Sequence, residues 1–211
     1  MTYPQSHSLQ FKLLAAFLVI LFLTGGSARD DVTSLLVLRP IAVLALGAGL
    51  LTLSRAQLLA NRTVFYLFAA LVLLIALHAV PLPPAVWQAI PGRQLVAEID
   101  RAAGLAGTWR PLTLEPYGTW NALFAMVVPA AILVLAAQLS RHEHVRLLYL
   151  LGGLMVASAL LGMLQVLGNP GGPLYFYRIT NNGSVVGLFA NRNHQALLLA
   201  LALPTFAVLA A

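Results

Sequence analysis

Residues 145–167 of the chain read VRLLYLLGGLMVASALLGMLQVL, an apolar run with a single charge at Arg146. A helix of this length can cross the hydrocarbon core of a bilayer, which takes about 20 predominantly apolar residues. Similar blocks recur along the chain. The six blocks lie at roughly 13–24, 35–53, 64–80, 119–139, 145–167 and 194–211. We therefore expect an all-α, polytopic transmembrane helix bundle of about six spans, with residues 1–211 forming a single transmembrane domain.

Composition supports this class of protein. Apolar residues make up 60% of the chain and charged residues only 9%, against roughly 25% charged residues in soluble domains. The chain has no cysteine, which excludes disulfides and thiolate metal sites. The net charge of +6 comes from single basic residues at span ends and in loops. No basic run or stripe is present, so nucleic acid is not an expected partner, and no motif indicates a metal or cofactor.

The first block is short and is also consistent with the apolar region of a signal peptide, with the small residues 26–28 as its cleavage site. A second apolar block follows after a short turn, which favours a retained span.

Charges in the short turns predict the orientation. The turn after the second block carries Arg55 and Arg62 without an acidic residue, and the turn after the fourth carries Arg141 and Arg146 against Glu143. Because basic residues collect on the cytoplasmic side, we expect a cytoplasmic amino terminus. The segments that then face outward are 25–34, 83–118 and 169–192.

Two features concern helix shape and packing. Pro129 lies inside the fourth block and predicts a kink, because proline removes a backbone hydrogen bond. In the fifth block, Gly153 with Ala157 and Ser158 with Gly162 place small residues four apart. That spacing is typical of close helix–helix contacts in lipid.

The outer segment 83–118 contains a predicted amphipathic helix over 93–103. Leu95, Ile99 and Ala102 share one face, so we expect this interfacial helix to lie along the membrane surface. Four aromatic side chains bracket it, as rings do at headgroup depth. They are Trp87, Trp109, Tyr117 and Trp120. We interpret the segment as shaping the outer end of the bundle, with direct contact to a substrate as the alternative.

The outer segment 169–193 leads into the last block. Asn191 is a candidate amino-terminal cap for that helix, and Arg192 and His194 then occupy its first turn. A cation there opposes the helix dipole, and an anionic ligand bound by free amides and the guanidinium would compensate for it. The alternative is that Arg192 extends to the interface and His194 bonds a neighbouring helix.

The run GLFANRNH at 187–194, followed by an Ala/Leu-rich span ending near Pro204, resembles the O-antigen ligase and O-antigen polymerase family of bacterial membrane proteins. The stretches LYFY at 174–177 before NNG at 181–183, and WRPL at 109–112, support the resemblance. Helix order and the amphipathic outer segment agree with it.

The resemblance implies a function. Such proteins move a glycan from undecaprenyl diphosphate to lipid A-core or a growing polymer, without a nucleotide sugar or a required metal. They act at the periplasmic face of the inner membrane and have roughly ten to twelve spans of bilayer-crossing length. We therefore expect 1–211 to match the amino-terminal half of such a protein, as a truncated product, a fragmentary gene model or half of a split protein. The family's catalytic histidine lies in a later outer loop, so the catalytic residue remains unknown here.

The resemblance also implies that outward-facing arginines hold the lipid diphosphate. The expected binding residues are Arg192, Arg178, Asn191, Asn193, His194, Arg39 and Arg110. Arg39 has an alternative as the partner of Asp30 or Asp31.

The remaining polar residues are harder to assign to chemistry. We expect Gln165 to bond a neighbour rather than a sugar, and His78 to be a packing residue. His142 and His144 are interpreted as solvated loop residues.

Two other functions compete with glycan transfer. A transporter or flippase component would need polar residues deep inside several spans, and these spans are strongly apolar. A non-catalytic membrane subunit or remnant is the other alternative.

Overall fold

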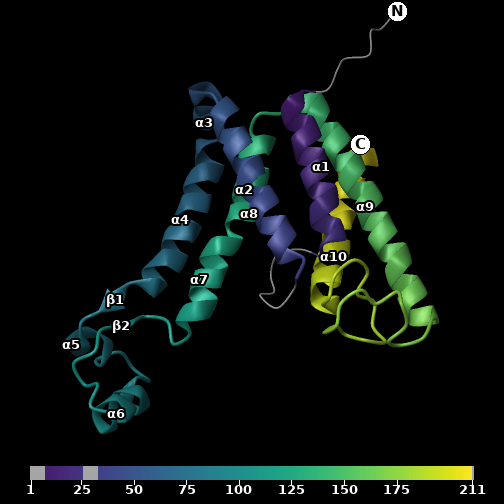
Figure 1. Cartoon of the computed structure of the whole chain (residues 1–211). Helices are drawn as coiled ribbons and strands as arrows, with labels where there is room; N and C mark the ends of the chain where they lie inside the picture. Colours follow the sequence, from purple (N-terminus) through teal and green to yellow (C-terminus); the bar gives the residue numbers. More distant parts are fainter. Residues whose placement is uncertain (1–7, 26–32, 211) are drawn as a thin grey trace, which may run out of the picture. The chain divides into compact units, whose positions relative to one another are not determined.

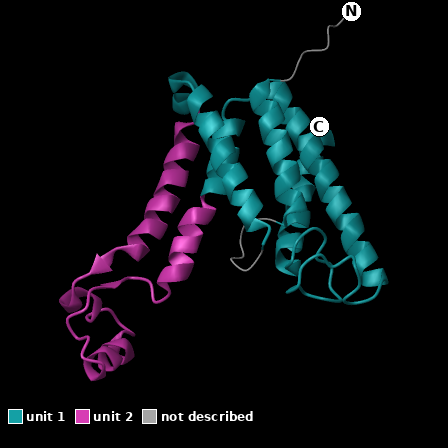
Figure 2. Cartoon of the chain, in the orientation of Figure 1, with its two compact units in different colours: residues 1–60, 127–211 teal, residues 61–126 magenta. Residues whose placement is uncertain are grey.

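The computed structural model describes residues 8–25 and 33–210. The chain divides into two compact units, and Figure 2 shows both. Unit 1 contains residues 1–60 and 127–211, and unit 2 contains residues 61–126. The architecture is all-α, with one pair of two-residue strands in the described part.

Unit 1 holds six helices in the described residues (Figure 1). They are α1 (Leu9–Leu23), α2 (Leu35–Thr52), α3 (Arg55–Ala60), α8 (Val127–Ala136), α9 (Arg141–Leu167) and α10 (Arg192–Ala210). The end of α1, the start of α2 and the loop from α9 to α10 lie at the same end of this unit, which we call its loop end. The predicted grouping of 25–34 with 169–192 on one side agrees with this placement at residue 25, since the Tyr177 ring lies against Gly25. Residues 26–32 lie outside the described residues.

Unit 2 consists of an 18-residue helix, a 10-residue helix and the segment between them. Its elements are α4 (Arg62–Ala79), β1 (Pro81–Leu82), α5 (Pro84–Trp87), α6 (Gln94–Ala102), β2 (Arg110–Pro111) and α7 (Pro116–Ala125). The strands are antiparallel, with Leu82 opposite Arg110. Helices α4 and α7 contact each other. The predicted helix over 93–103 is confirmed as α6, which covers residues 94–102.

Five helical segments of the described chain are long and apolar enough to cross a membrane. They are Leu35–Thr52, Arg62–Ala79, Pro116–Ala136, Arg141–Leu167 and Arg192–Ala210. The first predicted block forms the shorter apolar helix α1, and the signal-peptide alternative rests on residues 26–28, which lie outside the described residues. The prediction of a polytopic helical bundle is confirmed.

The fourth block is interrupted where the proline predicts. Helix α7 ends at Ala125 and α8 begins at Val127. Pro129 has no N–H to donate to the carbonyl of Ala125 four residues earlier, so the helix cannot continue regularly across this point.

A single carboxylate fixes the starts of two helices in unit 1. Ser140 and Glu143 form a capping box at the start of α9, in which the Ser140 N–H donates to Glu143 Oε2 at 2.9 Å. The other oxygen, Oε1, accepts from the N–H of Ser8, the cap residue of α1, also at 2.9 Å. Glu143 is buried and joins α1 to α9 at the end opposite the loop end.

The core of unit 1 lies between α1, α2, α8 and α9. Its fully buried residues are Leu14, Leu38, Ala42, Ala131 and Leu135. Helices α2 and α8 approach closely at Gly49, where an added Cβ would lie 2.8 Å from Val134 Cγ1.

Gln138 strengthens the α2–α8 contact. Its Nε2 donates to the carbonyl of Gly49 at 2.9 Å, and its Oε1 accepts from Thr52 Oγ1 at 2.8 Å. The pair of helices is thus joined by both small-residue packing and polar bonds.

The small residues of α9 contact more than another helix. Gly152 lies against Phe206 of α10, and Ser158 bonds Gln195 of α10. In contrast, a Cβ on Gly162 would meet Val185 of the outer loop, and Gly153 has open space around it. The predicted helix–helix contact is therefore confirmed at Ser158, whereas Gly162 packs against the loop and the contact predicted at Gly153 stays a prediction.

Substituting Gly49 tests the α2–α8 packing. We expect Gly49→Ala to lower the free energy of unfolding by about 1–3 kcal/mol, because the added methyl overpacks a rigid contact. Gly47→Ala, in the same helix with nothing within 4 Å of its added Cβ, is the matched control and should not destabilise. Unfolding of the two variants in the same detergent measures the difference, and equal stability would contradict the close packing.

Candidate functional site

The loop between α9 and α10, residues 168–191, is held by a buried amide. Gln165, on the last turns of α9, is only 1% exposed. Its Nε2 donates to the carbonyls of Leu174 and Gly187, both at 2.9 Å. Its Oε1 accepts from the N–H groups of Val186 at 3.1 Å and Gly187 at 2.8 Å. All hydrogen-bonding capacity of this amide is used within the protein, which confirms that Gln165 bonds its neighbours.

A second buried contact lies nearer the middle of α9. Ser158 Oγ donates to Gln195 Oε1 at 2.7 Å and accepts from the Leu188 N–H at 3.1 Å. It therefore connects α9, the loop and α10. Gly187 packs against the Ser158 and Gln195 side chains. Its φ is +57°, a backbone conformation that favours glycine.

Two tyrosines fasten the rest of the loop. The Tyr177 hydroxyl donates to the Leu188 carbonyl at 3.1 Å, and burial raises the pKa of Tyr177. The Tyr175 hydroxyl lies 3.2 Å from the carbonyl of Ser184 and 3.3 Å from that of Gln165. The loop thus has a defined course without regular secondary structure.

The start of α10 is capped by asparagine side chains. Asn191 Oδ1 accepts from the Asn193 N–H at 2.8 Å, which confirms the predicted cap. Asn181 Oδ1 accepts from the Arg192 N–H at 3.1 Å, and the Asn191 carbonyl accepts from the His194 N–H at 3.1 Å. The first amides of the helix are already bonded to protein. The expectation that free amides here bind an anion is therefore wrong, and only the side chains remain for a ligand.

Those side chains point outward. Arg192, Asn193 and His194 are all exposed, and Asn191 is half-buried. The His194 ring lies edge-on to Phe189, with 6.3 Å between ring centroids. A guanidinium, an amide and an imidazole together form a surface suited to phosphate oxygens.

The other predicted binding residues lie elsewhere. Arg178 is exposed in the same loop, and Arg39 is half-buried near the start of α2 in unit 1. Asp30 and Asp31, the alternative partners of Arg39, lie outside the described residues. Arg110 belongs to unit 2. Residues 191–194 lie together because they are consecutive in the chain, and Arg178 lies in the loop that leads to them.

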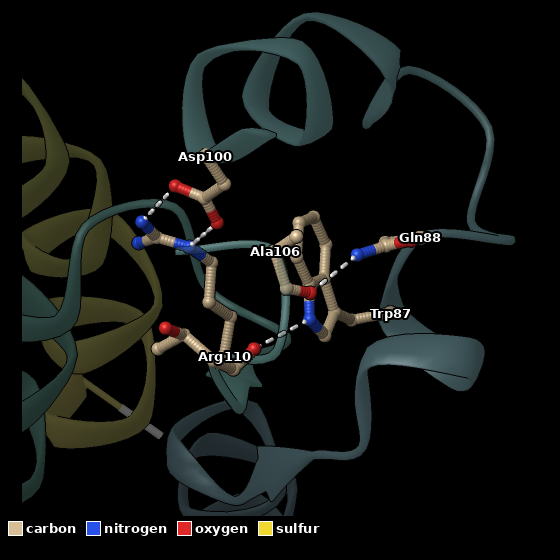
Figure 3. Close-up of polar contacts among 6 residues, drawn as sticks. Trp87, Gln88, Asp100, Ala106 and Arg110 are labelled. Carbon is tan, nitrogen blue, oxygen red and sulfur yellow. Dashed lines mark hydrogen bonds and ion pairs between the residues drawn. The ribbon is translucent and has the colours of Figure 1, made fainter. Parts of the chain in front are cut away.

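Arg110 is already paired with a carboxylate (Figure 3). Its Nε donates to Asp100 Oδ2 at 2.5 Å, and its Nη2 forms an ion pair with Asp100 Oδ1. Asp100 is 1% exposed, and hydrogen bonding to Arg110 holds the pKa of this carboxyl below its usual value. This bidentate pair joins α6 to β2, so the geometry gives Arg110 a structural role rather than a free charge.

Further hydrogen bonds hold the segment that contains this pair. Trp87 is fully buried, and its Nε1 donates to the Thr108 carbonyl at 3.0 Å (Figure 3). Buried Arg93 donates to the Leu112 carbonyl. The prediction that Trp87 is an interfacial ring is therefore wrong, whereas Trp109, Tyr117 and Trp120 are exposed as such rings would be.

Helix α6 presents its apolar face outward. Leu95 is 67% exposed and Ile99 57% exposed, while Ala97 and Asp100 on the opposite face are buried. Contact of this face with a membrane stays a prediction.

The described residues contain no group of three or more His, Asp or Glu side chains placed to hold a metal ion. Comparison of the chain with models of known protein families, with characterised proteins and with solved structures gives no match. The fold itself defines the class: the chain is a multi-pass α-helical membrane protein with a structured loop between α9 and α10.

Gly187 offers a test of the loop's attachment. An added Cβ would lie 2.4 Å from both Gln195 Oε1 and Ser158 Oγ. Gly183 has a similar φ of +74° but no neighbour closer than 3.7 Å. We expect Gly187→Ala to cost about 1–3 kcal/mol more unfolding free energy than Gly183→Ala, because both are strained but only one is overpacked. Equal losses in detergent unfolding would contradict the attachment.

The Asp100–Arg110 pair predicts an acid-sensitive fold in unit 2. Because the folded-state pKa of Asp100 is lowered, the pair stabilises the segment at neutral pH. This contribution is lost as pH falls below about 4 and through the folded-state pKa. The fluorescence of buried Trp87, in a Trp109→Phe, Trp120→Phe background, should report the transition. In Asp100→Asn, the part of the acid-induced fluorescence change that is due to this pair should be absent. An acid profile identical to that of the parent would contradict a stabilising role of the pair.

Proposed function

We propose that this chain binds a glycan linked to a polyprenyl diphosphate and takes part in transferring that glycan, as O-antigen ligase-like proteins do. The observation that carries the proposal is the exposed Arg192, Asn193 and His194 turn at the loop end of unit 1. The sequence resemblance over 187–194 centres on the same turn.

The chemistry of this turn suits a lipid diphosphate. Arg192 can donate two parallel hydrogen bonds to phosphate oxygens, and Asn193 and His194 can donate others. Because Asn181 and Asn191 occupy the backbone amides of this turn, the phosphate contacts come from side chains. The apolar helices that lead away from the turn give a polyprenyl chain a hydrocarbon environment.

In a transfer reaction these cations would act on the leaving group. When the acceptor hydroxyl attacks the sugar carbon, the bond to the diphosphate breaks and its oxygens gain negative charge. Arg192, with Arg178 from the preceding loop, would stabilise that charge. The acceptor on this proposal is lipid A-core or a growing glycan.

Orientation forms part of the proposal. The loop end of unit 1 would face the periplasm, with the chain in the bacterial inner membrane and its amino terminus in the cytoplasm. The arginines in the turns after the second and fourth apolar blocks support this orientation.

A second candidate is a non-catalytic subunit that binds the lipid-linked glycan. Transfer needs a base for the acceptor hydroxyl. Apart from His194, the described histidines of unit 1 are His142 and His144, in the first turn of α9. Both lie at the end of unit 1 opposite the loop end, away from the 191–194 turn, which favours a binding role for this chain.

Replacing Arg192 tests the proposed binding. We expect Arg192→Ala to weaken binding of a polyprenyl diphosphate to the reconstituted full chain about tenfold or more, because a hydrogen-bonded charge is lost. Arg101→Ala removes an exposed arginine of α6 in unit 2 and serves as the matched control, with unchanged affinity expected. Calorimetry or fluorescence quenching gives both constants.

Three results would count against the proposal. The first is that the wild-type chain binds no polyprenyl diphosphate. The second is that Arg192→Ala binds it as tightly as the wild type, and the third is that both arginine variants lose the same affinity. Glycan transfer by the wild-type chain with a supplied acceptor would separate the enzyme from the non-catalytic subunit.

A further inference from the structure

Helix α10 lacks a polar stripe that would define its rotation. Beyond its first turn its sequence is ALLLALALPTFAVLA, in which Thr205 is the single polar residue. Lipid tails are as apolar as these side chains, so burial of apolar surface does not select the face that turns toward α9. Specific contacts must set the rotation instead.

A buried hydrogen bond from Ser158 to Gln195 joins these two helices. Both side chains are buried, Ser158 completely and Gln195 to 1% exposure. Ser158 Oγ donates to Gln195 Oε1 at 2.7 Å. The other end of this amide, Nε2, has no hydrogen-bond partner within the described residues. The Gln195 side chain is therefore held in this place through Ser158.

Further contacts lie on the same face of α10. Ala202 is buried, and Phe206 touches Gly152 of α9. Both follow Gln195 at spacings that return to one side of a helix. The Ser158–Gln195 bond is the polar member of this stripe and lies closest to the start of α10.

The rotation of α10 decides where the first turn points. Gln195 directly follows His194 and comes three residues after Arg192. A change of one residue in helical phase turns every side chain by roughly 100° about the axis. With Gln195 facing α9, His194 and Asn193 lie roughly 100° and 200° from it around the axis, and Arg192 lies about 60° from it one turn earlier. All three are exposed at the start of the helix.

We propose that Ser158 and Gln195 are positioning residues, whose hydrogen bond fixes the rotation of α10 and so the direction in which Arg192 and His194 point. That these side chains then hold a diphosphate rests on the proposed function. The rotation itself does not, and it can be measured without a ligand.

The chain has no cysteine, so single cysteines can be introduced directly. Spin labels at successive positions from 196 to 203 of the full chain, in lipid vesicles, report rotation through their accessibility to oxygen. We expect low values at Leu198, Leu199 and Ala202 and high values at Leu197 and Leu203, following their exposure.

Removing the bond should change this pattern. In Ser158→Ala and in Gln195→Leu the phase should shift, or the contrast between the two faces should fall at least twofold. The double variant should resemble the single variants, because the two residues act through one bond. Thr205→Val is the matched control, since the Thr205 hydroxyl bonds the Leu201 carbonyl of its own helix, and it should keep the wild-type pattern.

Binding of a polyprenyl diphosphate to the same variants gives the second measurement. Affinity should fall about tenfold in Ser158→Ala and stay unchanged in Thr205→Val. An unchanged accessibility pattern in Ser158→Ala overturns the inference. A changed pattern with undiminished affinity supports the role of the bond in the rotation but contradicts a diphosphate site at the first turn of α10. If the wild-type chain binds no polyprenyl diphosphate, the proposed function fails, while the accessibility pattern still decides whether this bond sets the rotation.

Discussion

The side-chain amide of Gln165 is the contact on which the candidate site depends. It makes four hydrogen bonds to the backbone of the loop that follows α9, two as donor and two as acceptor. This stretch of loop is partly buried and forms no helix or strand, so its carbonyl and N–H groups need partners from elsewhere. Gln165 bonds both backbone groups of Gly187, because it donates to the carbonyl and accepts from the N–H. The chain then continues to the asparagine cap and the exposed turn of α10.

The same arrangement recurs at other places in the molecule. A buried or half-buried polar side chain bonds the backbone of a segment that is distant in sequence. Gln138 does so to Gly49 between α8 and α2, and Glu143 to Ser8 at the starts of α9 and α1. In unit 2, buried Asp100 instead binds the side chain of Arg110. Most of each helix is apolar, so a few such bonds specify which segments meet, whereas apolar contact alone is compatible with several arrangements.

Periodic and local features of the sequence predict much of this fold. The long apolar blocks predict the five span-length helices, because a membrane-crossing helix needs a minimum length and few charges. Pro129 predicts the interruption at Met126, and Asn191 predicts the cap of α10, because both effects act within four residues. The amphipathic pattern near residue 100 likewise gave α6.

Contacts between distant residues could not be predicted in this way. Nothing in the sequence near Asp100 identifies Arg110 as its partner. The sequence likewise does not show that Trp87 bonds the Thr108 carbonyl and is buried rather than interfacial. The amides at the start of α10 were expected to be free, but Asn181 from the middle of the preceding loop bonds one of them. The exposed residues of the candidate site follow from the sequence, whereas the residues that hold them in place follow from the structure.

Hydrogen exchange within the loop tests the account most directly. Val186 and Gly187 are buried and their N–H groups donate to Gln165, whereas Asn182 and Gly183 are exposed in the same loop. If Gln165 holds the loop on α9, the amides of 186 and 187 in the full chain in lipid should exchange far more slowly than those of 182 and 183. Equally fast exchange at all four amides would contradict the account.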